Sequence, residues 1–290
     1  DKYNEVPRLG TARLNSDGVI DTSFVGNVNG TVNVLALSGN GEVFIGGSFT
    51  QLNGMSANGL ARTTGTGVFL NGFSTYTPNT QVISLSLDQG GLPVASAVHN
   101  SSIFERRNPV VRHALAGSPD SSFNLLVDSP ADIRSISIQS DGRVLVTGGI
   151  SRVNGVFTDG IARINPNGSV DTSYDPPTVG SYTNSFLLSN GKAFVTGFLE
   201  CGFPNIRDLI LLSEDGSLDQ SFQIGAVSGR IMDLAEQPDG KIIIVGDFTH
   251  VGGIARNGVA RVNLDGSVDT TFNVGAGPDQ PVNAVKILPS

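Results

Sequence analysis

The sequence contains no tryptophan, one cysteine and two methionines among its 290 residues, and only 15% of the residues are charged. The single cysteine, Cys201, excludes a disulfide within the chain. No apolar run approaches the roughly 20 residues that a membrane-spanning helix needs, so we expect no membrane insertion. The net charge of −8 makes a nucleic-acid partner unexpected, because such proteins present a basic stripe to the phosphates.

The short motifs of common chemistries are also missing. We find no nucleophile elbow, phosphate-binding loop or dinucleotide fingerprint. The histidines His99, His113 and His250 fall at unrelated positions without metal-ligand spacing. No loop has the alternating carboxylates and distal glutamate of an EF-hand. We therefore expect neither a cofactor nor a metal site, with a bound calcium ion as the open alternative.

What the sequence does contain is a repeat of 48 to 51 residues. In its clearest copy, Asn263–Phe272, the Asn, Asp and Gly positions predict a three-residue hairpin with a bulge. Two features define the other copies, namely the turn glycine and an aromatic residue six positions later. The glycines are Gly18, Gly67, Gly117, Gly168, Gly216 and Gly266, and the aromatics are Phe24, Phe73, Phe123, Tyr174, Phe222 and Phe272.

A second turn lies between these hairpins, and the apolar run after it ends in a small residue. These small residues are Gly47, Ala97, Gly148, Gly197 and Gly246. Each period thus holds four short strands, A to D, which in the last copy are Ile231–Glu236, Lys241–Phe248, Gly258–Asn263 and Ser267–Thr271. None has helical length or periodicity, so the predicted class is all-β. Four antiparallel strands per unit favour a propeller blade over a solenoid coil.

The segment GKIIIVGDFTHVGGIARNGVARVNLDGSVDTTF, residues 240–272, resembles the bacterial delta-sixty repeat, a propeller-type repeat of large secreted and surface proteins. The resemblance covers essentially the whole chain and is poorest over residues 54–123. It implies a propeller fold and an extracellular or cell-surface location in a bacterium. It carries no catalytic residues to this sequence.

The chain contains six C–D hairpins, five A–B hairpins and a last A strand at Val282–Leu288. This count predicts one six-bladed β-propeller domain over residues 1–290, with four-stranded antiparallel blades and a closing blade shared by the N- and C-terminal segments. Part of a seven-bladed propeller is the alternative. Because the closing blade lacks strand B, we expect a longer natural polypeptide or a neighbouring chain to supply it.

Arginine and aspartate recur eight residues apart across the C–D hairpin. The pairs are Arg13–Asp21, Arg112–Asp120, Arg163–Asp171 and Arg261–Asp269. Two repeats break the pattern, because Arg62 faces Leu70 and Leu211 faces Asp219. Repetition around a ring would spread these groups evenly instead of gathering them into one site. We therefore interpret the pairs as structural cross-strand ion pairs.

In such a blade the A–B and C–D turns share one face, and the longer B–C and D–A loops share the other. Function on a rigid scaffold usually resides in variable loops. The candidate ligand- or partner-binding residues on this long-loop face are Phe104, Arg106, Arg107, Tyr76 and Tyr182.

The sequence thus predicts a non-enzymatic extracellular binding or adhesion module that engages a protein or a glycan through the long-loop face. One alternative is a propeller glycan hydrolase or lyase with carboxylates around the axis, for which the candidates are Asp132, Asp175, Asp233 and Asp279. A second alternative is a structural component of a surface or filament assembly. The sequence does not rank ligands within the leading class.

Overall fold

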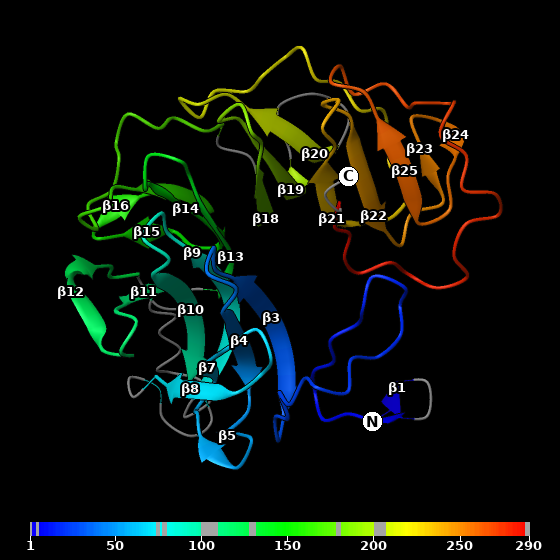
Figure 1. The fold of residues 1–290 in the computed structure, drawn as a ribbon. Helices are drawn as coiled ribbons and strands as arrows, with labels where there is room; N and C mark the ends of the chain where they lie inside the picture. Colours follow the sequence, from blue (N-terminus) through cyan, green and yellow to red (C-terminus); the bar gives the residue numbers. More distant parts are fainter. Residues whose placement is uncertain are drawn as a thin grey trace. The chain divides into compact units, whose positions relative to one another are not determined.

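The structure is a computed structural model that describes residues 2–3, 6–73, 76, 80–99, 110–127, 132–177, 181–199 and 207–287. Its contacts divide the chain into two compact units. Unit 1 comprises Asp1–Thr158 and Ala162–Asp171, and unit 2 comprises Asp159–Ile161 and Thr172–Ser290. Every regular element of the described residues is a β-strand (Figure 1), which confirms the predicted all-β class. None of these residues belongs to a helix that could span a membrane.

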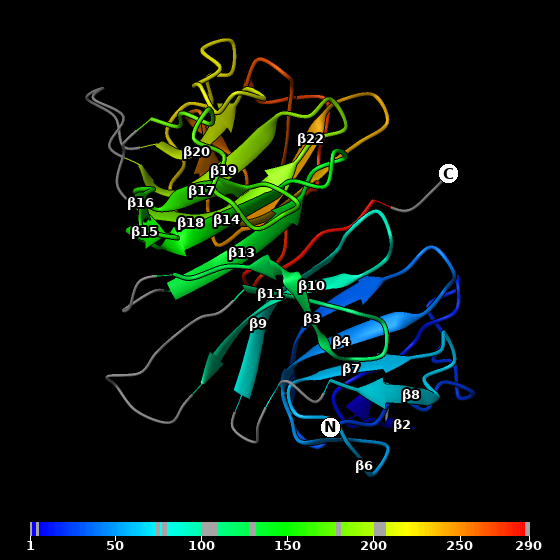
Figure 2. The same ribbon diagram turned by 90° about the vertical axis from the view of Figure 1, so that its left-hand side faces the viewer.

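Unit 1 contains two complete four-stranded antiparallel sheets and most of a third. The first sheet runs β3 (Thr31–Leu37), β4 (Val43–Ser48), β7 (Leu60–Thr63) and β8 (Phe69–Gly72), and Figure 2 shows these strands side by side. The second runs β9 (Thr80–Leu87), β10 (Pro93–His99), β11 (Val110–His113) and β12 (Pro119–Asn124). The third consists of β13 (Asp132–Ile138), β14 (Val144–Gly149) and β17 (Ile161–Ile164).

Unit 2 contains two three-stranded sheets. They are β18 (Ser181–Leu187), β19 (Ala193–Leu199) and β20 (Arg207–Leu212), followed by β21 (Ile231–Glu236), β22 (Ile242–Gly246) and β25 (Val259–Val262). The predicted strand D at Ser267–Thr271 is reduced to one bridge, between Val262 and Val268. The reason is local: Asp269 Oδ1 accepts hydrogen bonds from the amide and hydroxyl of Thr271, which turns the backbone away from the ladder.

A β-bulge interrupts strand A in each of the five sheets and explains the small residue that ends strand B. A Cβ atom on Gly47 would lie 2.0 Å from the carbonyl oxygen of Thr31. On Gly246 it would lie 1.9 Å from that of Arg230. Both distances are far below contact, so the recurring glycine permits the close approach of strands A and B.

The cores lie between successive sheets. In unit 1, Phe44 and Leu60 of the first sheet pack against Val82, Leu85 and Ala97 of the second. In unit 2, Phe194, Leu209 and Leu211 of one sheet pack in the same cluster as Leu234 and Ile244 of the next. Antiparallel sheets that pack face to face in chain order are the arrangement of propeller blades.

Short hairpins occupy the B–C connections of three sheets. They are β5 (Gln51–Leu52) with β6 (Met55–Ser56), β15 (Arg152–Val153) with β16 (Val156–Phe157), and β23 (His250–Val251) with β24 (Ile254–Ala255). In the turn of β5–β6, both central residues have positive φ, 51° at Asn53 and 77° at Gly54. A type I′ turn requires this conformation. In the first, partial copy, β1 (Lys2–Tyr3) pairs with β2 (Val6–Pro7). These three B–C connections are therefore regular hairpins, whereas the B–C connections at residues 100–109 and 200–206 lie outside the described residues.

The predicted strand A at Val282–Leu288 does not form in the described residues, which reach residue 287. The amide of Val285 instead donates to Asp233 Oδ2 of β21 at 2.8 Å. An equivalent hydrogen bond joins two regular A strands: the Ile136 amide of β13 donates to Ser84 Oγ of β9 at 2.9 Å. The segment thus lies where a next inner strand would lie, but among the described residues no strand B pairs with it.

Candidate functional site

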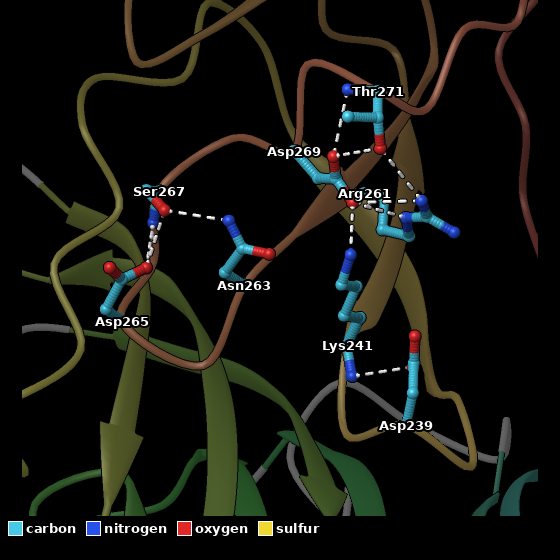
Figure 3. Close-up of polar contacts among 8 residues, drawn as sticks. All are labelled: Asp239, Lys241, Arg261, Asn263, Asp265, Ser267, Asp269 and Thr271. Atoms are coloured by element: carbon cyan, nitrogen blue, oxygen red, sulfur yellow. Dashed lines mark hydrogen bonds and ion pairs between the residues drawn. The ribbon is translucent and has the colours of Figure 1, made fainter.

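The structure places all four Arg–Asp pairs at ion-pair distance. The nitrogen–oxygen separations are 2.5 Å for Arg13–Asp21, 2.7 Å for Arg112–Asp120, 2.8 Å for Arg163–Asp171 and 2.9 Å for Arg261–Asp269. The Arg163–Asp171 pair is the most buried of the four, with side chains 7% and 9% exposed. In the last copy Lys241 adds a second cation, 2.7 Å from Asp269, and Figure 3 shows both cations converging on that carboxylate.

The aspartates of these clusters hold a local turn with their other oxygen. Asp21 Oδ1 accepts hydrogen bonds from the amide and hydroxyl of Ser23, at 2.8 and 2.6 Å. Ser122, Ser221 and Thr271 make the same two bonds to Asp120, Asp219 and Asp269. The serine bonds and the neighbouring arginine lower the pKa of Asp21 and of Asp120 to about 2.

The arginines also explain the recurring aromatic residue. The Arg261 guanidinium lies 4.8 Å from the ring centre of Phe272, and that of Arg112 lies 5.0 Å from Phe123. Arg112 Nη1 then donates to the carbonyl of Pro166, in the C–D turn of the next sheet, at 3.0 Å. Sequence reasoning missed this role, although a constant spacing between arginine and aromatic was visible. The clusters of Arg112 and Arg13 each link a hairpin, its aromatic residue and the next C–D turn.

Two of the predicted binding residues are corrected, because the structure buries them. Tyr76 is 3% exposed, packs in the cluster of Phe44 and Phe73, and forms a 2.9 Å hydrogen bond between its hydroxyl and His113 Nε2. Burial lowers the pKa of His113 to about 4, so this is a contact between neutral groups. Tyr182 is 1% exposed and donates to the Pro177 carbonyl at 2.6 Å. Neither side chain is available at the surface.

The other three predicted binding residues, Phe104, Arg106 and Arg107, lie outside the described residues. Of the four axial carboxylates, Asp132 forms an exposed ion pair with Arg134 at 2.8 Å. Asp233 is half-buried, and burial raises its pKa. Asp175 and Asp279 are exposed. The described residues contain no group of three or more acidic, histidine or cysteine side chains placed to bind a metal.

Unit 1 contains an open groove of about 770 Å³ beside the hairpin β5–β6. One side is the D–A connection through Val25, Asn27 and Asn29, and the other is the hairpin with Gln51, Asn53 and Met55. Leu9, Val68 and Phe69 also line the groove, and its lining contains no charged residue. We call this feature the hairpin groove. Its apolar side chains are unusually open, with Leu9 57%, Met55 54%, Val68 51% and Val25 44% exposed.

Amide side chains fix the walls of the hairpin groove. Asn53 Oδ1 accepts a hydrogen bond from the Asn27 amide at 2.9 Å, and its Nδ2 donates to the Gly67 carbonyl at 2.9 Å. Asn29 Oδ1 accepts hydrogen bonds from the amides of Thr50 and Gln51, each at 2.9 Å. The groove is therefore preformed. It combines a D–A connection with a B–C connection, the two loop types that the sequence analysis assigns to the functional face.

Comparison with known proteins agrees with the blade arrangement. A family described as a domain of unknown function (DUF5122) beta-propeller matches residues 1–24, 139–174 and 237–272, which contain three of the C–D hairpins. No curated protein matches the chain. The chain is therefore a propeller-type repeat protein, although the match does not carry the delta-sixty name.

Many solved structures are similar to this chain, and two of them have TM-scores of 0.50 or above. A protein of unknown function from Bacteroides caccae is 17% identical, with a TM-score of 0.50 over 82% of this chain and 80% of that one. Virginiamycin B lyase from Staphylococcus aureus is 15% identical, with a TM-score of 0.54 over 84% and 69%. At this identity the likeness shows the fold alone.

Proposed function

We propose that this chain is a non-enzymatic binding module of an extracellular or surface bacterial protein, and that it engages a protein partner through the hairpin groove. The observation that carries the proposal is the groove itself, which is preformed and apolar and is built from the connections between strands. Its volume of about 770 Å³ lies in the range of small-molecule and peptide sites. Connections on a rigid scaffold are the usual location of binding residues.

The lining favours an uncharged polypeptide segment over a glycan. Leu9, Val25, Met55 and Val68 offer apolar contact, while Asn27 and Gln51 add amides at the edge. Sugar rings usually stack on an open aromatic face, and the one aromatic residue of the lining, Phe69, is partly buried. The absence of charge in the lining also disfavours an ionic ligand, although the chain carries a net charge of −8.

The number of blades and the closure of the ring are also part of the proposal. We infer one six-bladed domain over residues 1–290, with a closing blade shared between the terminal segments. The six C–D hairpins of the sequence support the count. The contact of Val285 with Asp233 supports a sixth inner strand. An experimental structure with seven inner strands around one axis would replace this count.

Asp233 is the observation that favours an enzyme as the second candidate, because a half-buried carboxyl with a raised pKa is common at catalytic sites. Its carboxylate, however, is occupied by the amides of Val285 and Leu234. A glycan hydrolase or lyase would turn over a polysaccharide and lose that turnover in Asp233→Asn. Turnover that depends on Asp233 would replace the binding proposal.

The test uses immobilised chain to capture proteins from bacterial surface and secreted fractions, with a glycan array in parallel. Met55→Lys and Val25→Glu place charges in the groove at side chains that are 54% and 44% exposed, so folding should be retained. Val156→Lys is the matched control, since Val156 follows the Asn-Gly turn of hairpin β15–β16 as Met55 follows that of β5–β6. We expect one protein to be captured by the wild type and the control but not by the groove variants. Capture by all variants alike, or binding on the glycan array alone, would refute the assignment.

A further inference from the structure

Phe157, in the hairpin β15–β16 of unit 1, is the one exposed aromatic side chain among the described residues, at 61%. The arginines of the C–D clusters lie over rings such as Phe123 and Phe272. Among the described residues, Phe157 takes part in no such contact and in no contact between rings. Its face is therefore open to a ligand.

The cross-strand register places Arg152 beside this ring. Arg152 pairs with Phe157, and Val153 pairs with Val156. Val153 is fully buried, so the alternation of side chains along a strand directs Arg152 and Phe157 to the outer side of the hairpin. Arg152 Nη1 donates to the Gly155 carbonyl at 3.0 Å. No ion pair of the described residues includes this guanidinium, so it keeps further N–H groups for a ligand.

The hairpin holds the two side chains in place. Its central residues have positive φ, 49° at Asn154 and 78° at Gly155, as in the turn of β5–β6. Asn154 Oδ1 accepts a hydrogen bond from the Leu126 amide at 2.7 Å, and its Nδ2 donates to the Gly168 carbonyl at 2.8 Å. Leu126 is itself 64% exposed and adds apolar surface beside the turn. The surface is therefore preformed.

The other two hairpins of this kind lack the arginine and the ring. The two positions hold Gln51 and Ser56 in β5–β6, and His250 and Ala255 in β23–β24. The repeat therefore folds without a cation or an aromatic residue at these positions. The hairpin β15–β16 departs from the other two at two neighbouring exposed positions at once, which is typical of a site for one ligand.

We propose that Arg152 and Phe157 form a binding site for the hexuronic acid units of an anionic polysaccharide. The apolar C–H face of the sugar ring stacks on Phe157. The carboxylate of the sugar accepts charge-assisted hydrogen bonds from the Arg152 guanidinium. A single open ring suits a sugar better than a protein partner, because a protein hot spot requires a well-packed pocket that excludes water. Since the chain carries a net charge of −8, its attraction for the anion is local to this arginine.

The test measures binding of an oligogalacturonate by isothermal titration calorimetry. The fully methyl-esterified oligomer, which has the same rings without the charge, is the ligand control. Phe157→Ser and Arg152→Gln install the residues that β5–β6 carries at these positions, so folding should be retained. We expect each variant to weaken binding about tenfold, and the ester to bind the wild type as weakly.

Arg230→Gln is the matched control for charge, because it also removes one cation, from a side chain that is 74% exposed in unit 2. It should leave the affinity for the oligogalacturonate unchanged. Equal losses in Arg152→Gln and Arg230→Gln, or no loss in Phe157→Ser, would mean that net charge alone matters and would overturn the proposal. Absence of saturable binding to the oligogalacturonate would overturn it as well.

Poly-glutamate separates a sugar from a polypeptide ligand. It carries carboxylates without sugar rings, so we expect it to bind weakly and without dependence on Phe157. Tight binding of poly-glutamate that is lost in Phe157→Ser would identify an acidic polypeptide as the partner and overturn the proposal. Met55→Lys in the hairpin groove should not weaken binding of the oligogalacturonate, so this proposal and the proposed function can fail separately.

Discussion

The ammonium group of Lys192 lies 2.6 Å from the carboxylate of Asp219, in the one described C–D hairpin whose arginine position holds a leucine, Leu211. The converse exchange occurs at Arg62, whose aspartate position holds Leu70. There Glu42, from the same strand B position as Lys192, lies 2.7 Å from the guanidinium. Charged residues can therefore stand at three positions of the repeat: the start of strand B, strand C, and just after the C–D turn. When the arginine or the aspartate is lost, the residue at the start of strand B supplies the opposite charge.

This relationship predicts that Lys192 contributes more to stability than Lys241, the lysine at the same position of the last copy. Lys192→Met leaves Asp219 without a strong cation and should lower the melting temperature by about 2–4 °C, the shift expected for roughly 1 kcal/mol in a domain of this size. Lys241→Met should have a smaller effect, because Asp269 keeps Arg261 at 2.9 Å. Scanning calorimetry of both variants measures the difference. Adding Leu211→Arg to Lys192→Met should restore the loss, and equal losses in the two single variants would contradict the compensation.

The sequence predicts the ion pairs better than their surroundings, for a physical reason. A three-residue hairpin fixes its own register, so the eight-residue spacing of Arg261 and Asp269 determines that their side chains meet. The partner of Asp219 is 27 residues away across a turn, and no local rule selects Lys192. Tyr76 has the sequence context of a loop residue, yet packing against the next blade buries it. The hairpin groove joins connections on two blades, so only the tertiary structure reveals it.

The more deeply an ion pair is buried, the more the loss of its arginine should destabilise the fold. Arg163 and Asp171 are 7% and 9% exposed, so Arg163→Ala leaves a buried carboxylate whose remaining cation is Arg143, 3.5 Å away, and should cost about 2 kcal/mol of unfolding free energy. Arg13 is 38% exposed, and Arg13→Ala should cost at most about 1 kcal/mol. Urea unfolding followed by circular dichroism measures both values. Similar losses for the two variants would argue against burial as the determining factor.

The same reasoning separates the ion pairs from the binding site. Arg261→Ala should lower the melting temperature clearly, since the guanidinium contacts both Asp269 and the ring of Phe272. Capture of a partner through the hairpin groove should remain as in the wild type. Unchanged stability with loss of binding would reverse the structural interpretation of the Arg–Asp pairs.

Stability should fall in acid over a defined range. Hydrogen bonds and basic partners lower the pKa of Asp21, Asp120 and Asp219 to about 2 in the folded chain. Unfolded aspartate has a pKa near 3.9, so these groups stabilise the fold above about pH 4 and lose that contribution as the pH falls toward 2. The melting temperature should drop in this window, and Asp120→Asn should flatten part of the drop. A profile without a drop between about pH 4 and 2 would contradict the assignment.

The charge of Asp233 should have the opposite effect on stability from that of Asp21, Asp120 and Asp219. Burial raises its pKa, so the fold favours the protonated form, and ionisation at neutral pH opposes folding. Asp233→Asn removes the charge and keeps an oxygen that can accept the amide hydrogen bond of Val285. The variant should therefore melt at a higher temperature than the wild type at pH 7 and lose this advantage in acid. A lower melting temperature at pH 7 would show that the carboxylate charge is needed.

The turn glycines allow backbone strain to be separated from contact between blades. Gly18 and Gly266 occupy the same position of the C–D turn, with φ of 80° and 86°. A Cβ atom on Gly18 would meet nothing within 4 Å, whereas one on Gly266 would lie 2.4 Å from the carbonyl carbon of Gln223. Gln223 belongs to the connection after the previous hairpin, and its amide donates to the Asp265 carbonyl at 2.8 Å. Both glycines therefore need a positive φ, but only at Gly266 would a side chain also clash with a neighbouring connection.

Gly18→Ala should cost about 1 kcal/mol, the strain of a left-handed conformation for an L-residue. Gly266→Ala adds a clash with backbone atoms that cannot rotate away, so it should cost at least about twice as much and separate the two blades locally. Urea unfolding gives the two free energies, and amide hydrogen exchange at Gln223 and Ile224 reports the local separation. Equal costs, with unchanged exchange at Gln223, would mean that the glycine is retained for its φ alone and that the blades do not meet at this turn.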